Sequence, residues 1–109
     1  MAVRSKRLWG PLAVPPVLTV VYTVPAGETA LVKSLAIHNA NAAAQGIAIS
    51  LNGVAPQDRV TNIPCAGNSG IQINGLFWVF HPGDQIYVSA ALGLIYMSAY
   101  GSELEGVAD

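Results

Sequence analysis

Charged residues are scarce in this chain of 109 residues. Asp, Glu, Lys and Arg together make up 10% of it, and apolar residues make up 52%, whereas about 25% charged residues is typical of soluble domains. A small monomer of this composition has few polar groups with which to cover its surface. We therefore expect much of the surface to be buried against other chains, because obligate interfaces are large and apolar. The alternative is a monomer surfaced by Ser, Thr, Asn, Gln and Ala.

Cysteine, histidine and long apolar runs are also missing or rare. Cys65 is the only cysteine, so no disulfide can form within the chain, and we interpret it as a small buried residue. His38 and His81 are the only histidines and form no close cluster with other metal ligands, so no metal or cofactor is expected. No stretch of about 18 apolar residues runs without Pro, Gly or polar residues, and we expect no contact with a membrane.

No catalytic motif stands out. Ser69 lies in Gly67–Gly70, which is not a nucleophile elbow, and the chain has no P-loop. Glu28 and Asp84 could face each other as paired carboxylates. The simpler interpretation is that each caps backbone N–H groups in its own turn. We therefore predict that the protein is not an enzyme and has no small-molecule substrate.

Two turns of the same kind each precede a β-rich segment. Val24–Glu28 leads into residues 29–39, and Phe80–Asp84 leads into residues 85–92. In both, an apolar residue is followed by Pro, then Gly, then an acid. Pro ends strand pairing, Gly permits a positive φ, and the acid can accept backbone N–H bonds. Paired turns of this kind predict an all-β sandwich.

The remaining strands are predicted from alternation and β-rich composition. Ile47–Asn52 alternates so that its Ile and Leu side chains face the core, and Asn52-Gly53 ends it with a turn. Leu76–Phe80 is apolar without alternation, which indicates burial on both faces. The segments 85–91 and 94–100 are interpreted as the last hairpin, before a short acidic tail over 103–109. Predicted strands cover residues 18–24, 29–39, 47–52, 59–63, 71–74, 76–80, 85–91 and 94–100, which is typical of a single jelly-roll-like β-sandwich over residues 18–109.

Residues 1–17 are expected to form an extended N-terminal arm, because Pro11, Pro15 and Pro16 oppose both helix and central strand. The same prolines interrupt the apolar segment that an export signal would need.

Three of the five basic residues lie among the first seven residues, whereas residues 8–109 carry two basic residues against six acidic ones, a formal charge of −4. We predict that the arm docks on a neighbouring chain, its cations pairing with acids and its apolar side chains filling grooves. The basic cluster is too short for nucleic-acid binding to be favoured. The predicted partner-interface residues are Arg4, Lys6, Arg7, Leu8, Trp9, Leu12 and Trp78.

Three segments resemble small virion proteins of tailed bacteriophages. They are Tyr22–Leu35 with Asn39 closing the strand, Pro82–Val88, and the end of the last strand at Tyr100–Leu104. The resemblance covers about residues 20–104 and rests on turn-and-strand motifs. The family often has Lys after the Gly of the first turn, where this chain has Glu28, so charge contacts at that turn are not carried over.

The resemblance implies a β-sandwich that assembles in the host cytoplasm into virions, often as a homotrimer. The expected function is that of a capsid decoration (cement) protein that binds the major capsid protein and bridges its subunits. One alternative is a tail, neck or baseplate accessory protein. A second is a carbohydrate-binding module that uses Trp78, Tyr87, Tyr96 or Tyr100 as stacking platforms, although a core or subunit contact is the more expected place for these aromatics.

Overall fold

The computed structural model describes residues 3–105 of the chain; residues 1–2 and 106–109 lie outside it. The described residues form nine strands and one short 3₁₀ helix, in agreement with the predicted all-β class. The elements are β1 (Val3–Ala13), β2 (Thr19–Thr23), β3 (Glu28–Asn39), β4 (Gln45–Leu51), η1 (Pro56–Asp58), β5 (Arg59–Cys65), β6 (Ser69–Ile73), β7 (Trp78–Phe80), β8 (Gln85–Ser89) and β9 (Ile95–Glu105).

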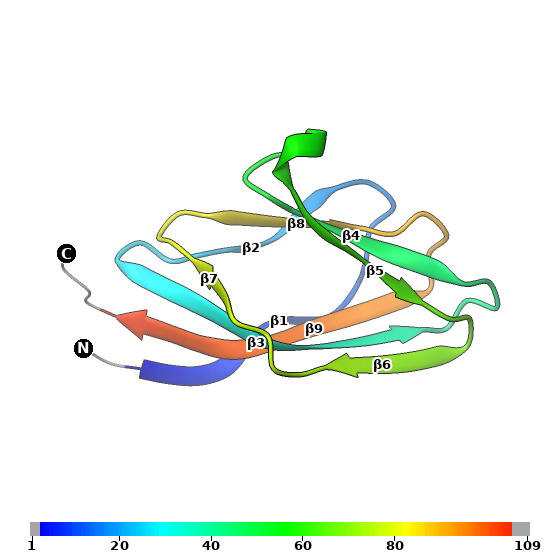
Figure 1. The fold of residues 1–109 in the computed structure, drawn as a ribbon, viewed down its shortest axis with the longest axis horizontal. Coiled ribbons are helices and arrows are strands. Elements are labelled where there is room, and N and C mark those ends of the chain that lie inside the picture. The colour runs from blue at the N-terminus through cyan, green and yellow to red at the C-terminus, as the bar shows by residue number, and fades with distance from the viewer. Residues whose placement is uncertain (1–2, 106–109) are drawn as a thin grey trace.

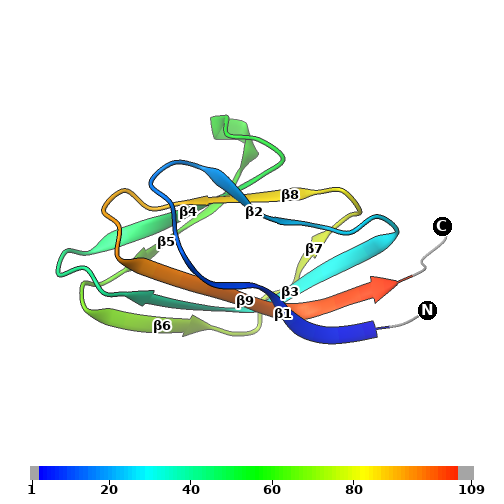
Figure 2. The ribbon, with the colours of Figure 1, turned by 180° about the vertical axis from the view of Figure 1, so that it is seen from behind.

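The strands form two antiparallel sheets that lie face to face (Figure 1). Sheet A has the order β1-β9-β3-β6. On the same side of β3 as β6, β7 pairs with the first part of β3 and β6 with its last part. Sheet B has the order β2-β8-β4-β5. Figure 2, from behind, shows the chain leaving β1 in one layer and rising to β2 in the other. The predicted β-sandwich is confirmed.

The pairing is nested along the chain. The innermost pair is β4 with β5, followed outward by β3 with β6 and β7, then β2 with β8, and finally β1 with β9. A long antiparallel ribbon that is folded over on itself produces this order, which is the two-Greek-key arrangement of a jelly roll. The strand order, which the sequence did not predict, is therefore that of a jelly roll.

The core lies between the sheets and is built by the alternation of the strands. In β4, Ile47 and Ile49 are fully buried as predicted, and Leu51 is partly buried. Ser50, which points outward, is also buried, and its hydroxyl accepts a hydrogen bond from Arg59 Nε at 3.0 Å. The other large, fully buried apolar side chains are Val24, Val32, Leu35, Ile86, Val88, Ile95 and Met97.

The two Pro-containing turns lie side by side and connect the sheets. Gly27 and Gly83 both have positive φ, 77° and 83°, as their predicted role requires. The turns are bonded to each other: Val24 N donates to Asp84 O at 2.9 Å, and Gly83 N donates to Val24 O at 3.0 Å. The predicted capping is confirmed for Asp84, whose Oδ2 accepts a bond from His81 N at 2.8 Å.

The expected N-terminal arm is wrong for the described residues, because Val3–Ala13 forms β1 and pairs with β9 from Leu104 to Tyr96. Proline is tolerated there because β1 is an edge strand with a partner on one side only. Pro11 falls in a register irregularity between Trp9 and Leu12, and the other two prolines follow the strand end. The boundary expected at residue 17 therefore does not separate an arm from the sandwich.

Two strand predictions need correction. The segments 85–91 and 94–100 do not form a hairpin, because β8 pairs in sheet B and β9 in sheet A. Leu76–Phe80 is not buried on both faces: Phe77 is 74% exposed and Val79 42%, whereas Phe80 is buried. β7 is short and has a partner on one side only, so its outward side chains are open to solvent.

A cluster of three amide side chains, Asn39, Asn41 and Gln45, closes one end of the sandwich; we call it the amide cluster. Asn39 is fully buried, and its Nδ2 donates to the carbonyls of Ala43, Cys65 and Ala66 at 3.0–3.3 Å. Its Oδ1 accepts bonds from Asn41 N and from Gln45 Nε2, each at 3.0 Å. Gln45 in turn bonds to the backbone at residues 92 and 93. Three loops are thereby held together without any charge.

Candidate interaction surface on sheet A

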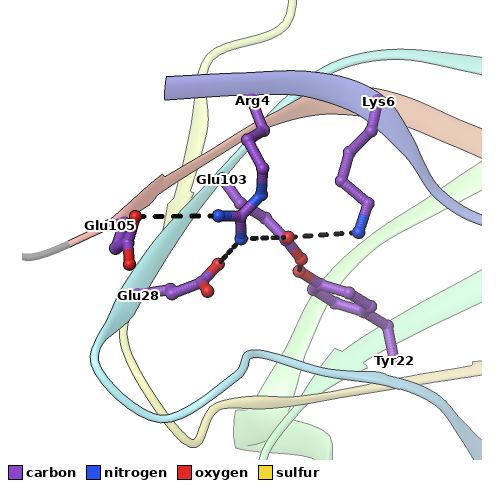
Figure 3. A network of polar contacts seen from close by, with 6 residues as sticks. All are labelled: Arg4, Lys6, Tyr22, Glu28, Glu103 and Glu105. Atoms are coloured by element: carbon purple, nitrogen blue, oxygen red, sulfur yellow. Dashed lines mark hydrogen bonds and ion pairs between the residues drawn. The ribbon is translucent and has the colours of Figure 1, made fainter. Parts of the chain in front are cut away.

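At the opposite end of the sandwich, charged side chains converge between the sheets; we call them the charged cluster (Figure 3). Glu103 is 2% exposed, and its Oε1 lies 3.1 Å from Lys6 Nζ and 3.2 Å from Arg4 Nη2. Its Oε2 accepts a hydrogen bond from the Tyr22 hydroxyl of sheet B at 2.5 Å. Arg4 also contacts Glu28 at 2.6 Å and, at 3.9 Å, the exposed Glu105. These six residues link β1, β2, β3 and β9.

The contacts set the protonation of this cluster. Burial alone would raise the pKa of Glu103, but the hydrogen bonds from Tyr22, Lys6 and Arg4 outweigh it and lower that pKa below its ordinary value. Burial, together with the bond donated to Glu103, raises the pKa of Tyr22. The bonds to Glu28 and Glu103 raise the pKa of Arg4. Glu103 is therefore a carboxylate, and Tyr22 a neutral phenol, at neutral pH.

Most of the predicted interface residues are turned into their own chain, which corrects the docking prediction. Arg4 and Lys6 pair with acids, as expected, but those acids belong to the same molecule. Leu8 and Trp9 are buried in the core, and the Trp9 ring lies 5.6 Å from the ring of Tyr22. A neighbouring chain cannot receive side chains that the core already holds.

The other three predicted interface residues keep some exposed surface. Leu12 and Trp78 are partly buried against the core, and Trp78 meets Phe80 edge to face at 6.4 Å. Arg7 is exposed and points away from the core, opposite Tyr100 in the register of β1 and β9. Of the basic residues predicted to bind a partner, Arg7 alone lies on an outer face.

The outer face of sheet A is centred on one row of β9, in which two tyrosines alternate with two serines. Tyr96 and Tyr100 are 39% and 38% exposed, whereas Ser98 and Ser102 are 5% and 1% exposed. The Ser98 hydroxyl donates to the Tyr100 hydroxyl at 3.1 Å. Across β3, Ala36 lies opposite Ser98 and His38 opposite Tyr96. The middle of this face is thus formed by small and aromatic residues.

Two bulges flank the row at the same level. The register shifts between Arg7 and Trp9 on β1, and between Val32 and Ser34 on β3. Bulges bend a strand and re-aim its side chains. A hollow of about 470 Å³ opens here; we call it the basic hollow. It is lined by Ser5, Lys6, Arg7, Lys33, Ser34, Tyr100, Gly101 and Ser102.

A second hollow of about 390 Å³ lies further along the same face. His38, Tyr96 and Gln72 contribute side chains to it, together with Pro11 from the edge strand. Its lining carries no acid or lysine. The two hollows make the outer face of sheet A uneven, and Ser98, which lines the second, is bonded to Tyr100, which lines the first.

The residues that were considered for catalysis or metal binding have structural roles instead. Glu28 pairs with Arg4, while Asp84 caps its turn and accepts a bond from Asn52 Nδ2 at 3.0 Å. Cys65 is buried, as expected. Within residues 3–105, no three His, Cys, Asp or Glu side chains gather closely enough to hold a metal ion. No helix in that range is long and apolar enough to cross a membrane.

Comparisons with known proteins do not identify a family for this chain. No family model and no curated protein matches the chain. A solved structure described as "Crystal structure of Agl-KA catalytic domain" superposes with a TM-score of 0.45 at 14% identity. The match covers 98% of this chain but 26% of that one.

Sequence reasoning did not place Lys33, Tyr100 and Ser102 beside Arg7 in one hollow. The alternation of Tyr and Ser over residues 96–102 was a usable signal, since it places all four on one face of a strand. The bulges that bring Arg7 and Lys33 to either side of Tyr100 left no comparable signal in the sequence.

Proposed function

We propose that the protein is a non-enzymatic structural component of a tailed-phage virion, acting as a capsid decoration protein. The observation that carries the proposal is the outer face of sheet A, which combines exposed tyrosines and small residues with the cations Arg7 and Lys33. Aromatic residues and Arg are enriched in protein interfaces, so Tyr96, Tyr100 and Arg7 suit such a contact. Further large apolar side chains are exposed at Val79, on β7 of the same sheet, and outside the strands at Val17, Val54, Phe77, Leu92 and Leu94.

The segments that resemble phage virion proteins have a structural role that supports the proposal. Tyr22–Leu35 and Pro82–Val88 contain the two mutually bonded turns that join the sheets. The jelly roll is also an architecture found in viral capsid domains, although a fold hosts many functions.

A decoration protein acts by adding contact area. Bound across neighbouring capsid subunits, it stabilises the assembled shell by mass action, because it has affinity for the assembled state and not for separated subunits. A homotrimer would bring three such faces to one site and increase avidity without new contacts. The partner on this proposal is the major capsid protein.

Copy number in purified particles tests the proposal. Quantitative mass spectrometry against the major capsid protein should give one copy per one to a few capsid subunits. A ratio near one per hundred would instead indicate a position in the neck, tail or baseplate. Absence from particles would refute both virion roles.

Exposed aromatics support a second candidate, a carbohydrate-binding module. Tyr96 and Tyr100 lie on one face of β9, about 13 Å apart at 3.3 Å per residue, and each borders a hollow. Trp78 and Tyr87 are less suitable platforms because both are partly buried. A glycan array on which the full chain binds nothing would remove this candidate.

A further inference from the structure

We propose that the basic hollow is where an acidic side chain of the protein partner docks, its carboxylate held by Arg7, Lys33 and the Ser102 hydroxyl. The inference rests on the proposed function and adds to it which face meets the partner and what chemistry the partner presents there.

The first line of support is uncompensated charge. Arg4 and Lys6 are ion-paired, whereas no ion pair or side-chain hydrogen bond of Arg7 or Lys33 occurs within residues 3–105. Both are exposed, and both line the same hollow from strands on either side of β9. An Arg and a Lys that flank a hollow match a carboxylate, which accepts charge-assisted bonds from each.

The second, independent line is an unsatisfied hydroxyl. Ser102 lines the hollow and is only 1% exposed, and its Oγ has no hydrogen-bond partner among the described residues. In the register Ser102 lies opposite Ser5, on the outward face that both residues share with Arg7 and Tyr100. A buried polar group without a partner costs free energy, so a ligand oxygen that accepts its O–H would remove that cost.

The shape of the site favours a macromolecular partner over a small ligand. The hollow is open and lies on a sheet face, so it cannot enclose most of a small molecule's surface, as ligand pockets do. A protein surface that covers the surrounding row of Tyr and Ser residues would exclude water from the ion contacts and strengthen them. Nucleic acid fits less well, because the two unpaired cations of the hollow, Arg7 and Lys33, make few phosphate contacts.

Charge reversal tests the site in particles assembled with variant chains. Arg7→Glu and Lys33→Glu should each lower the copy number per particle by about tenfold. Arg59→Glu is the matched control: it makes the same charge change on sheet B, where Arg59 bonds to Ser50 and Asn62, and should leave the copy number unchanged. Wild-type copy number for both sheet A variants would overturn the inference, while absence of the wild-type chain from particles would refute the proposed function instead.

A second experiment needs no particle and decides the site if the virion role fails. N-acetylglutamate amide, titrated into the isotope-labelled full chain, should shift the backbone amides of Arg7, Lys33 and Ser102, and the glutamine analogue should not. Ser102→Ala should weaken the shift without lowering the free energy of unfolding, because the hydroxyl it removes has no partner in the fold. Equal shifts with both probes, or none at these residues, would overturn the inference.

Discussion

The two ends of the sandwich are closed by different chemistry. Neutral amides at Asn39, Asn41 and Gln45 hold three loops at one end, whereas ions gather around Glu103 at the other. Both groups satisfy polar atoms that the ends of the apolar core would otherwise leave buried and unpaired. The amide cluster is insensitive to pH and salt. The charged cluster responds to both, so this comparison locates the condition-dependent part of the stability.

The largest effect is expected at the amide end. Asn39→Ala should lower the free energy of unfolding by about 3 kcal/mol, because it leaves several backbone groups of the loops without partners. Urea denaturation measures it. Asn62→Ala is the matched control, since Asn62 is exposed and accepts a single long bond from Arg59. Equal destabilisation by the two substitutions would show that the amide cluster does not close this end.

Removal of Arg4 and Lys6 from the charged cluster should lower the free energy of unfolding somewhat less than Asn39→Ala does. The double variant Arg4→Met/Lys6→Met leaves the Glu103 carboxylate buried with Tyr22 alone, and should lower the free energy of unfolding at neutral pH by less than Asn39→Ala does. The outward pair Arg7→Met/Lys33→Met removes the same charges and should be close to neutral. If both double variants unfold at the same urea concentration, the inward cations are not stabilising Glu103.

A fall in pH should destabilise the charged cluster but not the amide cluster. The pKa of Glu103 is lowered in the folded state, so its contribution is present above the unfolded value of 4.5 and is lost as pH falls through the folded pKa. Wild-type and Asn39→Ala chains should therefore lose stability below about pH 4.5. Glu103→Gln should be less stable at neutral pH but show a shallower loss in acid. If Glu103→Gln loses stability in acid as steeply as the wild type does, the loss is caused by other groups.

The smallest effect is expected at the rim of the charged cluster. Glu105 is 58% exposed and lies 3.9 Å from Arg4, so Glu105→Gln should cost about 0.3 kcal/mol or less. That difference should vanish in about 1 M salt, where screening acts over about 3 Å. Thermal unfolding at low and high salt measures it. A loss that survives high salt would mean that Glu105 contributes by packing.

The two similar turns show how far local sequence predicts a site. Pro25–Gly27 and Pro82–Gly83 adopt the conformation expected, because Gly alone accepts the positive φ readily. The acids differ: Asp84 caps its own turn, while Glu28 reaches Arg4 on β1. The longer Glu side chain and the arrival of β1 beside it decide this outcome, and neither the turn motif nor its spacing contains that information.

The errors in the prediction share one physical cause. Prolines correctly indicated that Val3–Ala13 is not a central strand, but the segment still pairs with β9 as an edge strand of sheet A. Adjacent segments such as 85–91 and 94–100 were expected to pair because short loops favour hairpins, but nested pairing puts β8 and β9 in different sheets. Partners far apart in the chain outcompeted the local ones.

The all-β class, the turns that precede β3 and β8, and inward rows such as Ile47 and Ile49 follow from local sterics and side-chain alternation, so they could be predicted from the sequence. The inward orientation of Arg4, Lys6 and Trp9, and the outward placement of Arg7 and Lys33 beside Ser102, could not. Those placements depend on strand order and on two bulges beside β9. Both arise from contacts between residues as much as 99 positions apart, as Arg4 and Glu103 are.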